Sequence, residues 1–176
     1  HELSGIEFCQ MRPLRVADGY TMVRNIAKSL QKDSMCLMGT TNVNAVRKWM
    51  YSVGVGGRQL TKGIPIMQNF YNCLVRNGID DHGRLRQCPQ LARGFHQFWG
   101  REMTVRGTDI LPETREDVFV AWGYTPDEQV ALETYYDQLT FDFETLSSIR
   151  HLVPLVRDHR VAYLTSDIPT DLDLLC

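Results

Sequence analysis

The 176-residue chain lacks a long apolar segment and lacks paired cysteines. No uninterrupted hydrophobic run approaches the roughly 18 residues that a bilayer-spanning helix requires, so the sequence predicts no membrane segment. The five cysteines include no Cys-x-x-Cys pair, which argues against a disulfide framework and against a zinc site built on paired thiolates. We therefore expect reduced thiols in a cytosolic protein.

Familiar catalytic motifs are also missing. The sequence contains neither of the glycine-rich patterns that cradle phosphates, GxGxxG and GxxxxGK followed by Ser or Thr, nor the GxSxG elbow of hydrolases. Cys73, His82 and Cys88 have no fourth ligand at a usual zinc spacing. We accordingly assign no catalytic and no metal-binding residue within the chain. Because the first residue is His1 and no signal segment follows it, we expect a fragment or a processed product.

The net charge of -2 conceals an asymmetry along the chain. Residues 1–110 hold 15 Lys and Arg against 8 Asp and Glu, a net of +7, whereas residues 111–176 hold 4 against 13, a net of -9. A basic part of this kind is a candidate surface for a polyanion such as RNA or DNA. The alternative is that a basic and an acidic face pack against each other within one fold, and charge alone leaves both readings open.

The hydrophobic pattern predicts an α+β fold that begins with a short antiparallel hairpin. Residues 5–11 and 20–24 are β-prone and lie on either side of a turn signal at residues 17–19. Beyond residue 24 the pattern becomes helical. The sequence therefore predicts a small β element followed by a predominantly helical region.

Several helices are indicated by periodicity and by their end signals. The first begins near the cap Asn44 and is stopped by the glycines within 54–57, and the second extends from Pro65 to just before Gly78. A further helix is expected over residues 89–103. The clearest start signal is the capping box at residues 125–128, with Pro at the first helical position.

Basic residues follow the predicted hairpin directly. If that segment is helical, Arg24, Lys28 and Lys32 share one face, because they stand four residues apart. Like charges at this spacing destabilise a helix by roughly a few tenths of a kcal/mol per pair, unless an anion such as a phosphate backbone or a triphosphate neutralises them. The alternatives are a solvated basic edge and a pairing of Arg24 with Asp33 or Glu7.

Short motifs in the first 78 residues resemble a known polymerase family. The sequence reads IEFCQxxP from residue 6, MVRN from 22, KDS from 32, VRxW from 46, VG at 53, LTxGIP from 60 and QxFY from 68. In order and approximate spacing, these motifs resemble the stretch that begins at motif E in the RNA-directed RNA polymerases of tombusviruses, carmoviruses and their relatives, and that continues into the thumb.

The resemblance implies a division of the chain and a set of RNA-binding residues. Residues 1–24 would form the motif E hairpin at the palm edge, and residues 25–176 a mostly α-helical thumb with an acidic C-terminal part. Motif E acts as a primer grip in this family, which places Phe8, Cys9, Gln10 and Arg12 at the nascent RNA. Arg24, Lys28 and Lys32 are then expected to bind RNA or nucleotide phosphates.

The resemblance also implies that the catalytic centre lies elsewhere. In this family, palm carboxylates that include a Gly-Asp-Asp upstream of motif E hold two Mg²⁺ ions, and this sequence contains no Gly-Asp-Asp. The implied partners are the RNA template and nascent strand, nucleoside triphosphates, and the palm and fingers of the polymerase. The implied location is the host-cell cytoplasm, in viral replication complexes.

Two other functions remain open from the sequence. One is a non-catalytic RNA-binding module that uses the basic part. The other is a protein-interaction domain that uses the acidic, aromatic C-terminal part, with Trp122, Tyr135, Tyr136, Phe141 and Phe143.

Overall fold

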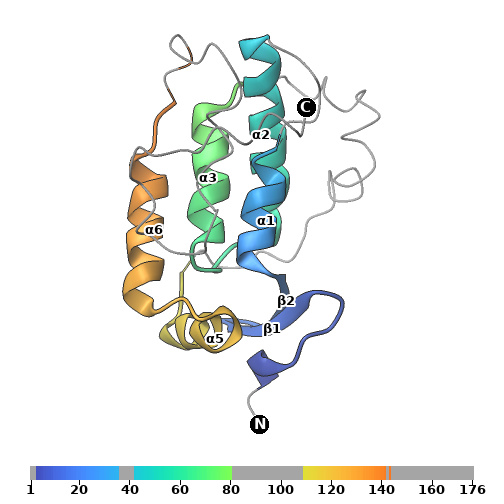
Figure 1. Ribbon diagram of the computed structural model, residues 1–176, viewed down its shortest axis with the longest axis vertical. Helices are drawn as coiled ribbons and strands as arrows, with labels where there is room; N and C mark the ends of the chain where they lie inside the picture. Colours follow the sequence, from blue (N-terminus) through green and yellow to red (C-terminus); the bar gives the residue numbers. More distant parts are fainter. Residues whose placement is uncertain (1–2, 36–41, 81–108, 142, 144–176) are drawn as a thin grey trace, which may run out of the picture.

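The computed structural model describes residues 3–35, 42–80, 109–141 and 143, and in this part of the chain it shows a two-stranded hairpin and five α-helices (Figure 1). The predicted α+β class is therefore confirmed. After the short 3-10 turn η1 (Leu3–Gly5), the elements are β1 (Met11–Val16), β2 (Gly19–Arg24), α1 (Ile26–Asp33), α2 (Val43–Leu60), α3 (Met67–Asn77), α5 (Pro112–Trp122) and α6 (Pro126–Gln138). The helix expected over residues 89–103 lies outside the described residues.

Four of the helices stand side by side, and the hairpin lies at one end of them together with α5 (Figure 1). The core lies among α1, α2, α3 and α6 and is filled by buried apolar side chains, among them Leu30, Met50, Phe70, Leu74 and Tyr136. The Phe70 and Tyr136 rings meet edge to face, with centroids 5.3 Å apart. Burial of this surface is the main force that holds the helices together.

The hairpin starts later than the sequence indicated. The first strand was expected over residues 5–11, and that placement is wrong, because β1 extends over residues 11–16. The antiparallel register places Val16 opposite Gly19 and Met11 opposite Arg24. A two-residue turn at 17–18 thus sets the register, and Gly19 has a φ of 117°, which disfavours other residues.

The glycines in α2 do not end the helix as predicted. The helix continues through Gly54 and Gly57 to Leu60, and both glycines are buried against α3. A methyl group on Gly54 would lie 2.8 Å from a side-chain carbon of Val75, and one on Gly57 would enter the ring of Tyr71. These glycines therefore allow the two helices to approach closely, although each lowers helix propensity by about 1 kcal/mol relative to Ala.

The remaining helix ends follow side-chain capping. Asn25 caps α1 by accepting the Lys28 backbone N–H at 3.0 Å, whereas α2 is capped by Asn42 and not by Asn44 as expected. The capping box of α6 is confirmed, with reciprocal hydrogen bonds between Thr125 and Glu128. The Gly78 end of α3 is also confirmed.

The aromatic side chains of the C-terminal part belong to the core. Tyr136 is buried, and the other residues named for a protein-interaction surface are partly buried against the core; these are Trp122, Tyr135, Phe141 and Phe143. The structure thus gives these side chains a packing role, and a contact with a partner protein stays a prediction. None of the helices in the described ranges combines the length and the hydropathy that crossing a bilayer would require.

Candidate nucleic-acid interface

A basic pocket of about 220 Å³ opens where the hairpin meets α1, and we call it the junction pocket. It brings together five of the seven site residues that the sequence predicted: Cys9, Gln10, Arg24, Lys28 and Lys32. Arg24 is the last residue of β2, and the two lysines stand on α1, one and two turns further on. All three cationic side chains are exposed. The predicted helical face holds for Lys28 and Lys32 but not for Arg24, which precedes the helix and reaches the same pocket from β2.

The rim of the junction pocket contains a strained turn. Phe8 and Met11 exchange backbone hydrogen bonds of 2.8 and 2.9 Å, which leaves Cys9 and Gln10 as the two turn residues. Their φ values are 51° and 63°, in the left-handed region that non-glycine residues seldom adopt. Such conformations cost of order 1 kcal/mol or more each and persist only where surrounding contacts impose them. One such contact is the 3.2 Å bond from the Asn25 N–H to the Gln10 carbonyl, which attaches the turn to the start of α1.

One carboxylate, Asp33, lies among these cations. The Tyr71 hydroxyl donates a 2.5 Å hydrogen bond to Asp33 Oδ2. Burial raises the pKa of Asp33, while the Tyr71 hydrogen bond and the charges of Arg24 and Lys32 act in the opposite direction. The pKa of Tyr71 is raised mainly by burial and further by the charge of Asp33 and the hydrogen bond to it. The hydroxyl therefore keeps its proton. Three cations against one carboxylate leave the pocket positive and suited to a phosphate.

The alternative pairings of Arg24 are only partly realised. Arg24 acts on Asp33 through its charge, but the hydrogen bond to that carboxylate comes from Tyr71. Glu7 lies 3.6 Å from the guanidinium of Arg12. Arg24 therefore interacts with Asp33 through charge, as one of the alternatives proposed. Its side chain nevertheless lines the junction pocket.

The other two predicted residues lie apart from the pocket lining. Phe8 is 70% exposed on the approach to the strained turn. The Arg12 side chain is directed at α5, where its Nη1 donates to the Ala121 carbonyl at 2.5 Å. Contact of Phe8 and Arg12 with RNA stays a prediction.

A feature that sequence reasoning missed is the attachment of the hairpin to α5. Asp117 accepts hydrogen bonds from the backbone N–H of Arg15 at 2.7 Å, from its Nε at 3.0 Å and from its Nη2 at 2.9 Å. Thr114 donates to the Arg15 carbonyl at 2.6 Å. The hydrogen bond to Asp117 is the main cause that raises the pKa of Arg15. The local signals for α5 were Pro112 at its first position and Gly123, with a φ of 81°, after its end.

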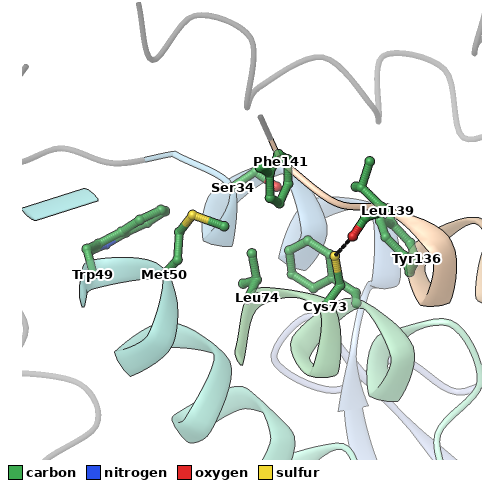
Figure 2. Close-up of a pocket in the computed structure, with 9 residues that line it drawn as sticks. Ser34, Trp49, Met50, Cys73, Leu74, Tyr136, Leu139 and Phe141 are labelled. Atoms are coloured by element: carbon green, nitrogen blue, oxygen red, sulfur yellow. Dashed lines mark hydrogen bonds between the residues drawn. The ribbon is translucent and has the colours of Figure 1, made fainter. Parts of the chain in front are cut away.

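A second hollow, between α2, α3 and α6, is apolar and belongs to the core. Figure 2 shows Met50, Leu74 and Tyr136 around it, with the Cys73 thiol directed at the Leu139 carbonyl 3.7 Å away. Its volume is about 20 Å³, close to the space that a single water molecule needs. Because burial raises the pKa of Cys73, the thiol stays neutral and is a poor nucleophile. This gap is a packing feature.

Metal ligands are not gathered in the described ranges. Nowhere in them do three His, Cys, Asp or Glu side chains converge into a group that could hold a metal ion.

Comparison with known proteins identifies the family of the chain. A family model described as "Viral RNA dependent RNA polymerase" matches residues 1–144. The chain is 38% identical over 139 residues to the RNA-directed RNA polymerase of Panicum mosaic virus (strain United States/Kansas 109S), covering 78% of this chain and 14% of the relative. It is 37% identical over 143 residues to that of Turnip crinkle virus, covering 79% and 18%. For Melon necrotic spot virus the identity is 39% over 140 residues, covering 78% and 17%.

The chain thus spans less than a fifth of the length of these relatives. No solved structure matches it.

Proposed function

This chain belongs to the viral RNA-dependent RNA polymerase family, and we propose that it forms the thumb side of such an enzyme, with residues 1–24 as the motif E hairpin and residues 25–176 as the thumb. In the complete enzyme, this part would hold template and nascent RNA while nucleoside triphosphates are added to the growing strand. The observation that carries the proposal is the junction pocket, where three cations and the strained turn of motif E converge.

The contribution of this part to catalysis is positioning. Nucleotidyl transfer depends on placing the attacking 3′ hydroxyl in line with the α-phosphate of the incoming nucleotide and on neutralising the negative charge that surrounds it. Cys9 and Gln10 would contact the end of the nascent strand, and Arg24, Lys28 and Lys32 would bind its phosphates or those of the initiating nucleotide. A fixed turn serves this role better than a mobile one, because a misplaced end lowers the rate without any change at the reacting atoms.

Metal ions are a general requirement of polymerase chemistry. We propose Mg²⁺ as the ion and palm carboxylates of the complete enzyme as its ligands, because the sequence contains no Gly-Asp-Asp of the kind that holds the ions in this family. The palm and fingers would be the protein partners of this part.

We further propose that the polymerase works in replication complexes in the host-cell cytoplasm. Immunofluorescence of infected tissue tests this location, and nuclear staining of the polymerase would refute it.

The junction pocket is tested with the double variant Lys28→Gln/Lys32→Gln in the full-length polymerase. RNA affinity is measured over a range of salt concentrations, and initiation is measured as a function of the first nucleotide. We expect the slope of log K against log salt to fall by about 0.7 to 0.9 for each phosphate that the variant no longer binds. The Michaelis constant for the initiating nucleotide should rise if its triphosphate occupies the pocket.

The control is Lys48→Gln, which removes one positive charge on α2 outside the junction pocket, against two in the double variant. Arg24→Ala should weaken initiation or RNA retention more than it lowers thermal stability. If the pocket variants retain the RNA affinity, salt slope and initiation of the parent while melting normally, the pocket does not bind phosphate and the proposed role is wrong.

A further inference from the structure

A second pocket, of about 250 Å³, lies where α2 ends and α3 begins, and we call it the α2–α3 pocket. Its lining consists of two cations and three amides: Arg58, Gln59, Lys62, Gln68 and Asn72. All five are polar, and none of the described residues that line it is a carboxylate. A hollow lined by these side chains attracts an anion, because two cations and three amides border it without an acidic side chain to neutralise the positive charge.

The wall of the α2–α3 pocket is fixed by the loop between the two helices. The Thr61 hydroxyl donates to the Gly57 carbonyl at 2.9 Å, and the Gly63 N–H donates to Gln68 Oε1 at 2.7 Å, which holds that side chain in the wall. Ile66 is fully buried with a φ of 66°, an unusual conformation for a β-branched residue.

Contacts with α6 maintain that conformation. The Ile66 N–H donates to Glu133 Oε1 at 3.1 Å, and Arg115 holds both oxygens of Glu133 at 2.9 and 2.8 Å. The loop is therefore set before any ligand arrives, which lowers the entropy cost of binding.

The position of the cations has a structural explanation that must be separated from a binding role. Arg58 stands in the last turn of α2, where positive charge is stabilised by the negative end of the helix dipole. A dipole role, however, requires no hollow and no convergent amides. The two roles differ in what they affect, since the first contributes to stability and the second to the affinity for anions.

Tyr71 contacts a residue that lines the junction pocket and adjoins the part of α2 that carries Arg58. The hydroxyl of this residue donates to Asp33 in the junction pocket, and its ring occupies the place that a side chain on Gly57 would need, next to Arg58. Asn72, which follows Tyr71 on α3, lines the α2–α3 pocket. We propose that the α2–α3 pocket is a second phosphate-binding subsite, which contacts the RNA backbone beyond the strand end held at the junction pocket. This inference rests on the proposed function and extends it along the thumb.

The test uses the full-length polymerase carrying Arg58→Gln/Lys62→Gln. The control Lys48→Gln removes one positive charge on α2, the helix that carries Arg58. Binding of a single-stranded and of a duplex RNA is measured over a range of salt concentrations. If each of the two cations binds one phosphate in the parent, the slope of log K against log salt should fall by about 1.4 for single strands and by about 1.8 for duplex. The control should keep the slope of the parent.

A second variant guards against an effect of altered folding. Asn72→Asp keeps the shape of the side chain and places a negative charge in the α2–α3 pocket. It should weaken RNA binding at low salt, where repulsion is strongest, with the melting temperature of the parent retained.

The outcomes separate the two proposals. A lower melting temperature with an unchanged salt slope would show a structural role for Arg58 and Lys62 and would overturn the inference. A raised Michaelis constant for the initiating nucleotide with an unchanged RNA slope would assign the pocket to a triphosphate and overturn the RNA assignment. If the Lys28/Lys32 variant loses RNA affinity and the Arg58/Lys62 variant does not, only the second subsite is wrong. If neither loses affinity, the proposed function fails as well.

Discussion

Removal of the Asp117 carboxylate should loosen the hairpin more than any other single change on α5. The carboxylate is 7% exposed and receives the backbone N–H and two guanidinium N–H groups of Arg15. Breaking a fully buried ion pair costs about 3 to 5 kcal/mol, and a hydrogen bond to a charged group contributes about 1.5 to 3 kcal/mol. Because the Arg15 side chain is 38% exposed, water replaces part of this interaction in the variant. We expect Asp117→Ala to lower the free energy of opening the hairpin by about 2 kcal/mol.

Hydrogen–deuterium exchange of the full-length polymerase measures this effect locally. A change of about 2 kcal/mol corresponds to roughly 30-fold faster exchange of the β1 and β2 amides, with little change in α2 and α3. The matched control is Glu116→Ala. Glu116 is the neighbouring residue on α5 and lies 3.3 Å from the same guanidinium, but its side chain is 68% exposed. An exposed pair of this kind contributes about 0 to 1 kcal/mol, so its removal should alter exchange by only a few-fold.

The same variant should also impair function without a change in the junction pocket. If the hairpin positions the nascent strand, Asp117→Ala should reduce initiation while leaving the salt slope of RNA binding at the value of the parent. Equal exchange rates in Asp117→Ala and Glu116→Ala would refute the assignment of the attachment to the buried carboxylate. Faster exchange with undiminished initiation would refute the link between hairpin position and activity.

Two further predictions concern Asp33 and Gly57, two residues that Tyr71 contacts. Burial raises the pKa of Asp33 above its ordinary value of 3.8. The stability that protonated Asp33 contributes is therefore fully present below pH 3.8 and is lost as the pH rises through the pKa of the folded state. In denaturant melts over this pH range, Asp33→Asn should lose less stability than the parent, because its side chain does not titrate. A steeper fall in Asp33→Asn than in the parent would contradict the direction of that pKa shift. Gly57→Ala should destabilise the protein by about 1 to 3 kcal/mol, because the Tyr71 ring must move, whereas Gly5→Ala, with nothing within 4 Å, should have little effect. Similar melting temperatures for both variants would exclude a tight helix contact at Gly57.

The parts of the fold that could be predicted depend on contacts between near neighbours in the sequence. The capping box at Thr125 joins residues three apart, and the helix end at Gly78 involves groups three and four residues away. The glycines of α2 were misread for the opposite reason. Within the sequence of one helix, Gly54 and Gly57 are typical of a helix end, and only the approach of α3 shows that they belong inside it.

The same distinction applies to the candidate site. The four-residue spacing correctly placed Lys28 and Lys32 on one face of α1, because four residues make about one helical turn, whereas Arg24 reaches the same pocket from the end of β2. The turn at Cys9 and Gln10 could be assigned only by resemblance, since two positive φ values at non-glycine residues leave no signature in the sequence. Asp117 could not be found at all, because its partner Arg15 lies 102 residues away.

Part of the charge asymmetry along the chain is explained by packing within the fold, one of the two readings that the sequence left open. Arg15 on the hairpin is neutralised by Asp117 and Glu116 of α5, so part of the acidic C-terminal charge meets part of the basic N-terminal charge inside the fold. Lys28 and Lys32, in contrast, stand exposed on α1. The net charge of the first 110 residues therefore overstates the surface that is available to RNA. If the proposed binding is right, the side of the hairpin on which a cation stands decides its role, because α5 contacts the hairpin through Arg12 and Arg15 and the junction pocket opens on α1.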